Sequence, residues 1–168
     1  MTSETSTFRY YLSLVLLFLP GVFFALFLVY LAEQPAHAVE LPFRLPWQFV
    51  LLAVAGIIAT AGGVLDWRFH RDPLKLRISK KEREAEAKAL GLGGLPMFVL
   101  MVLATLSANP QYYLIPIIIV LLYTTVAICY DEFVFHIHRC GREETIYHRM
   151  LVFGNCTAWL AWMHYIYV

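Results

Sequence analysis

The chain has 168 residues, of which 60% are hydrophobic and 15% are charged, and its formal net charge is +1. Soluble domains are closer to half apolar and a quarter charged, so this composition excludes a water-soluble globular protein. The length suits a single domain. The three cysteines are too few for a disulfide framework.

An apolar run of about 20 residues is long enough to cross the hydrocarbon core of a bilayer. Five such runs predict an all-α, polytopic integral membrane protein with one membrane domain over residues 1–168. The runs cover approximately 10–31, 47–65, 90–108, 112–130 and 150–168. We expect spans two and three, and spans four and five, to form two helical hairpins of one bundle, with span one added.

Span one could instead be a cleaved signal peptide, because Ala36-His37-Ala38 resembles a small-residue cleavage site. The apolar run is longer than the usual apolar region of a signal peptide, which is about 7–15 residues. A membrane span is therefore the favoured interpretation.

The basic residues set the expected orientation. Of the 13 lysines and arginines, only Arg44 falls on one side of the five spans. The other basic residues fall in the N-terminal segment and in the loops 66–89 and 131–149. Positive charge is concentrated in cytoplasmic loops, so the N-terminus is predicted in the cytoplasm and the C-terminus outside. The expected location is the plasma membrane, as in a bacterial inner membrane.

An acidic residue precedes a histidine by four positions at three places near the predicted cytoplasmic face. The pairs are Asp66–His70, Glu132–His136 and Glu144–His148. Residues four apart on a helix are neighbours on one face. A fourth pair, Glu33–His37, spans Pro35 and lies on the outer side, so we discount it.

Two of these pairs lie in matching segments. Residues 66–70 and 132–136 both read acid, aromatic, any residue, Phe, His. Each follows a span that descends to the cytoplasm, and each precedes a glutamate, Glu84 or Glu144, that leads into the next span. The match suggests an internal duplication whose halves are unequal, because Lys88 stands where the second half has His148.

Carboxylates and imidazoles from facing helices of a bundle form di-iron and di-manganese sites. Such mixed oxygen and nitrogen ligands suit iron or manganese, and zinc less exclusively. The predicted ligands of two metal ions, most simply iron, are Asp66, His70, Glu132, His136, Glu144 and His148. Further candidate ligands are Glu84, Asp131, His138 and Glu143. This site predicts a membrane metalloprotein and an oxidoreductase, similar to a hydroxylase or desaturase, acting on a lipid-like substrate.

The alternative is a structural polar network in which arginines and lipid headgroups pair with the acids, since surface ion pairs are common and weak. The protein would then be a non-enzymatic membrane subunit or assembly factor whose polar residues dock a membrane protein partner. Membrane lipids are expected partners in either case, and no nucleic-acid motif is present. The HxxxH and HxxHH boxes of membrane-bound desaturases are absent, so we assign no family.

Overall fold

The computed structural model describes residues 18, 21–27, 29–30, 33, 46–70, 81, 84–85, 88–136 and 141–168, without the side chains of His70 and His136. Every regular element within these residues is a helix, as predicted. The elements are α3 (Trp47–His70), the π-helix η1 (Ala89–Gly94), α5 (Leu95–Leu106), α6 (Gln111–Asp131), the π-helix η2 (Glu132–His136) and α7 (Arg142–Tyr167).

Three segments are long and apolar enough to cross a membrane. They are Trp47–Phe69, Ala89–Leu106 and Gln111–Phe135. Each contains or closely matches one of the predicted spans two, three and four. The structure therefore supports membrane insertion through at least these helices.

The first and fifth predicted spans are not among these three segments. Residues 10–31 lie largely outside the described part of the chain, although residues 21–27 are helical. All of the fifth except its last residue falls within α7, which has 26 residues and is long enough to cross a bilayer. Polar residues such as Asn155 and His164 lower its hydropathy, and it is not among the segments apolar enough to cross.

The helices continue past the predicted membrane boundaries. Helix α3 extends to His70, and α7 begins at Arg142, so much of the loop predicted at 131–149 is helical. Glu143 and Glu144 lie in the first turn of α7, where negative charge is favourable near the positive end of the helix dipole. Between α5 and α6 the chain makes the predicted tight turn, in which the Asn109 amide donates to Ser107 Oγ at 3.1 Å.

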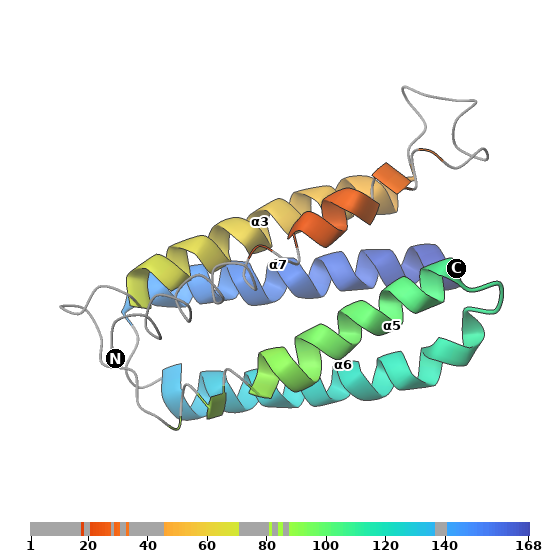
Figure 1. The fold of residues 1–168 in the computed structure, drawn as a ribbon. Helices are drawn as coiled ribbons and strands as arrows, with labels where there is room; N and C mark the ends of the chain where they lie inside the picture. The colour runs from red at the N-terminus through yellow and green to blue at the C-terminus, as the bar shows by residue number, and fades with distance from the viewer. Residues whose placement is uncertain are drawn as a thin grey trace, which may run out of the picture.

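The helices form two packed pairs (Figure 1). Helix α3 packs along α7 in the most extensive helix contact of the described fold, and α5 packs against α6. A smaller contact between α5 and α7 joins the two pairs. The predicted hairpin pairing, span two with three and span four with five, is not confirmed by these contacts.

Two glycines allow α3 and α7 to approach closely. A Cβ atom on Gly154 would lie 2.7 Å from the Ala59 amide nitrogen and 2.9 Å from the Ala55 carbonyl oxygen. A Cβ on Gly62 would lie 2.6 Å from the Leu151 amide nitrogen. Small residues at helix interfaces permit such close packing in membranes, where van der Waals contact contributes much of the association energy.

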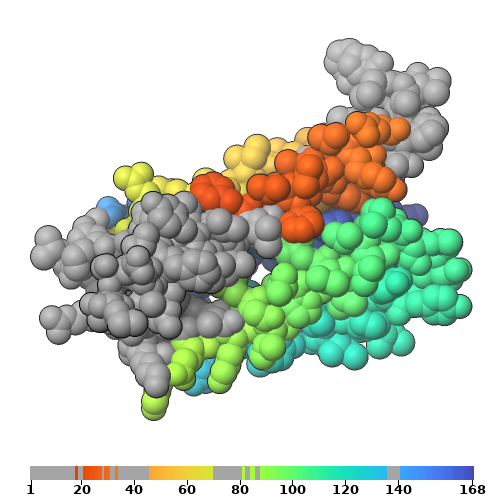
Figure 2. All heavy atoms as spheres, viewed as in Figure 1, coloured from red at the N-terminus to blue at the C-terminus, as the bar shows by residue number. Residues whose placement is uncertain are grey.

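The apolar core lies where an N-terminal helical segment (described residues 18, 21–27 and 29–30) covers α3, α5 and α7 (Figure 2). Phe24 packs against the rings of Phe98 and Trp159, with centroid distances of 5.7 and 5.4 Å. Phe27 lies 4.3 Å from the ring of Trp162. Aromatic contacts of this kind stabilise by about 0.5–1.5 kcal/mol beyond the area they bury.

Candidate functional site

The ionisable residues gather at one end of the helices. Helices α3 and α6 end where α7 begins, at the same end of the molecule (Figure 1). We define the polar cluster as Asp66 of α3, Asp131 of α6, Glu132 of η2, and Glu144 and His148 of α7. Glu144 lies 15 residues before the core residue Trp159, which is about 22 Å along the helix axis.

The contact between α3 and α7 places Asp66 at this level. Gly62 meets the backbone of α7 at Tyr147 and Leu151, and Asp66 follows Gly62 by about one helical turn. One turn further along, the ring of Phe69 lies 6.4 Å from that of Tyr147. Asp66 therefore lies beside the first turns of α7, the part of that helix that carries Glu144 and His148.

Several members of the polar cluster are buried. Glu144 is fully buried and Asp131 is 4% exposed. Oδ1 of Asp66 and Oε2 of Glu144 are also inaccessible to solvent. Glu143, directly beside Glu144 in the sequence, is exposed. Because burying a carboxylate is costly unless its charge is compensated, this arrangement differs from an ordinary solvated helix surface.

One contact joins η2, which follows α6 directly, to α7. Nε2 of His148 lies 3.7 Å from Oε2 of Glu132. This separation is longer than a hydrogen bond. It is close to the roughly 3–3.5 Å that separates two ligands bound at about 2.1 Å to the same ion. Both side chains are largely shielded, with 13% of His148 and 25% of Glu132 exposed.

Four of the six predicted ligands have described side chains: Asp66, Glu132, Glu144 and His148. The structure brings Glu132 and His148 together and places Asp66 on α3 and Glu144 on α7 at the same end. Among the side chains that the structure describes, no group of three or more is arranged to hold a metal ion. The predicted ligands His70 and His136 have side chains outside the described part of the chain.

The structure distinguishes Asp131 from its neighbour Glu132. The sequence favours Glu132 as a ligand because it lies four residues before His136, and Asp131 is a further candidate. Asp131 is the more buried of the two, and it ends α6 where the chain changes to the π-helix η2. The adjacent pair of acids at the end of an apolar run was the available signal, but the sequence does not show which one turns inward.

The described arginines at this end are more exposed than the acids of the polar cluster. Arg68, Arg142 and Arg149 are exposed. The buried acids thus lie closer to the bundle interior than the basic residues that were expected to surround them.

Comparison with known proteins adds no assignment. No family model, curated protein or solved structure matches the chain. The chemistry proposed for the polar cluster therefore depends on its own residues alone.

Proposed function

We propose that this protein is an integral membrane metalloprotein whose polar cluster forms part of a carboxylate–histidine site for two metal ions. The observation that supports the proposal is the burial of Glu144 and Asp131 at the end of the helices where Glu132, next to Asp131 in the sequence, lies 3.7 Å from His148. Carboxylates buried near one another repel, and bound cations offset both that repulsion and the cost of desolvation.

The proposed ligands are the six residues expected from the sequence, with Asp131 as an additional carboxylate. Their mixture of oxygen and nitrogen donors favours iron, with manganese or zinc as alternatives. Glu132 and His148, 3.7 Å apart, are the two that would share one ion. Histidines 70 and 136 would complete the set from the ends of α3 and η2.

The proposed reaction depends on the metal site and on the apolar surface next to it. A pair of iron ions would supply oxygen chemistry such as hydroxylation or desaturation. The exposed apolar side chains of α6, among them Val126 and Tyr130, would let a lipid-like substrate approach this end from the bilayer. The site would face the cytoplasm, with five spans, the N-terminus inside and the C-terminus outside.

Two neighbouring glutamates provide a matched test. Glu144→Gln removes a buried carboxylate, whereas Glu143→Gln makes the same change one residue away on the exposed side of α7. We expect Glu144→Gln protein, purified in detergent, to lose most of its iron, because replacing a ligand typically weakens metal binding severely. Glu143→Gln protein should retain wild-type metal content. The measurement is elemental analysis, with helix content by circular dichroism to show that both variants are folded.

Equal metal content in the two variants would contradict the proposal. A metal-free wild-type protein would also contradict it. If that metal-free protein instead co-purified with another membrane protein, and Glu144→Gln abolished the association, a role as a membrane subunit or assembly factor would replace the proposed one.

A further inference from the structure

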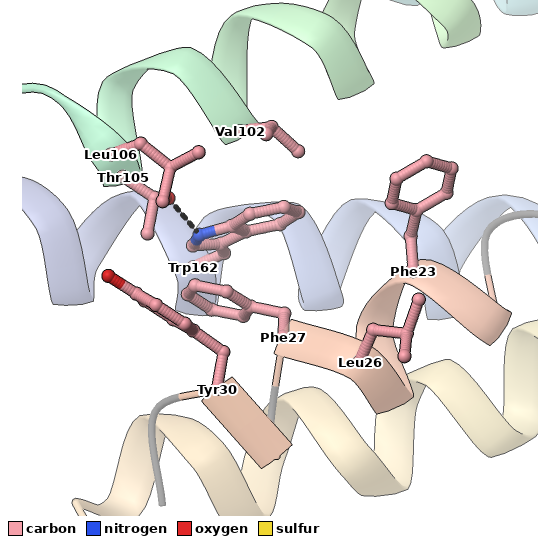
Figure 3. Close-up of a pocket in the computed structure, with 8 residues that line it drawn as sticks. All are labelled: Phe23, Leu26, Phe27, Tyr30, Val102, Thr105, Leu106 and Trp162. Atoms are coloured by element: carbon pink, nitrogen blue, oxygen red, sulfur yellow. Dashed lines mark hydrogen bonds between the residues drawn. The ribbon is translucent and has the colours of Figure 1, made fainter. Parts of the chain in front are cut away.

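A small apolar pocket lies far from the polar cluster, between the N-terminal helical segment, α5 and α7 (Figure 3). Its volume is about 180 Å³. The rings of Phe23, Phe27 and Tyr30 from the N-terminal segment line it. Val102 and Leu106 of α5 and Trp162 of α7 also line it, and the rings of Phe27 and Trp162 lie 4.3 Å apart.

The polar side-chain atoms of Trp162 and Thr105 in the wall of this pocket are hydrogen-bonded to protein. Trp162 Nε1 donates a hydrogen bond to Thr105 Oγ1 at 3.0 Å, and the Thr105 hydroxyl donates to the Met101 carbonyl at 2.7 Å. The surface presented to a ligand is therefore almost wholly hydrocarbon. Apolar cavities of about 150 Å³ stay dry and bind apolar molecules, so water is a poor occupant here.

The mouth of the pocket is continuous with the surface that would face the bilayer. Leu26 and Leu106 line the pocket and are 61% and 63% exposed. Along α5, the exposed side chains of Val99 and Leu103 continue the same apolar surface, and α5 belongs to a segment able to cross a membrane. The occupant with direct access is thus a lipid acyl chain.

The position of the pocket relative to the membrane surface indicates which part of the acyl chain would enter it. Helix α5 ends at Leu106, and the polar turn that begins at Ser107 follows directly. The Tyr30 hydroxyl lies on the same side of the pocket as Thr105 and Leu106 (Figure 3). Tyrosines with an apolar ring and a polar tip are typical of the boundary between hydrocarbon and headgroups.

We propose that this pocket binds the upper part of one phospholipid acyl chain, with the ester region near the Tyr30 hydroxyl. The site is distinct from the polar cluster and needs no metal. It fixes a lipid where the N-terminal segment meets α5 and α7, and the bound chain lies against the part of Trp162 that lines the pocket.

The test uses the protein in bilayers of phosphatidylcholine with brominated acyl chains, which quench tryptophan fluorescence on contact. Trp47, Trp67 and Trp159 are replaced by Phe, so that Trp162 alone reports. Val102→Phe in this background fills the pocket. Val99→Phe is the matched control, because Val99 lies nearly one turn earlier on α5, is exposed, and does not line the pocket. Leu106→Phe provides a second filling variant.

We expect strong quenching of Trp162, although this residue is only 1% exposed. Quenching should be lost in Val102→Phe and Leu106→Phe and preserved in Val99→Phe. Absence of quenching in the parent protein would overturn the proposal. Equal quenching in the parent and both filling variants would also overturn it, since lipid would then reach Trp162 without entering the pocket.

Discussion

At the scale of single residues, the buried acids show what spacing can and cannot predict. The four-residue interval assumes an α-helix, in which residues four apart share a face. Residues 132–136 form a π-helix instead, whose wider turn changes the direction of each following side chain. The interval favours Glu132 as a ligand, whereas Asp131 is the more buried of the two acids.

Glycine gives a second residue-scale prediction. Gly154 lies inside helix α7, and Gly94 has a right-handed helical backbone conformation at the start of α5. A Cβ at Gly154 would meet the backbone of α3, whereas a Cβ at Gly94 would meet no atom within 4 Å. The same substitution should therefore have opposite effects at the two positions.

We expect Gly154→Ala to destabilise the protein by about 1–3 kcal/mol, because overpacking against a backbone forces the helices apart. Gly94→Ala should stabilise it by about 0.5–1 kcal/mol, since alanine loses less conformational entropy in a helix. Unfolding of both variants in the same detergent measures the difference. Similar stability of the two variants would show that α3 and α7 do not pack through Gly154.

At the scale of elements, three spans were predictable because the length of an apolar run is a local property of the sequence. The ends of the helices were less predictable. Residues 66–70 and 142–149 carry charges that suggest a loop, yet both segments are helical. A helix that leaves the bilayer can continue in water or against another helix, so a change in polarity does not end it.

The pairing of helices depends on matched surfaces rather than on sequence order. The short connection at 107–110 joins α5 to α6, and these helices pack together. Helix α3 pairs instead with α7, where Ala55 and Ala59 lie against Gly154. This complementarity lies in two segments far apart in the chain, and neither segment identifies its partner alone. The predicted hairpins assumed that neighbours in sequence are neighbours in space.

At the scale of the whole molecule, α3 pairs with α7 and α5 pairs with α6. The matching segments 66–70 and 132–136 suggest an internal duplication, which stays a prediction. Internal repeats of this kind occur in many membrane proteins.

The orientation of the whole protein in the membrane can also be tested. The polar cluster and most basic residues should face the cytoplasm, because positive loops resist translocation. Alkaline phosphatase, which is active only outside the cytoplasm, should be active when fused after Val168 and inactive when fused within 71–80. The reverse result would place the polar cluster on the outer face and contradict the proposed orientation.

The buried carboxylates at this end are proposed to bind two metal ions together with histidines. Elemental analysis of the full-length protein, purified in detergent without chelators, tests this proposal most directly. We predict about two equivalents of iron or manganese per chain, as in other carboxylate–histidine bundles, and their loss in folded Glu132→Ala and His136→Ala variants. Folded wild-type protein with no metal above background would contradict the claim.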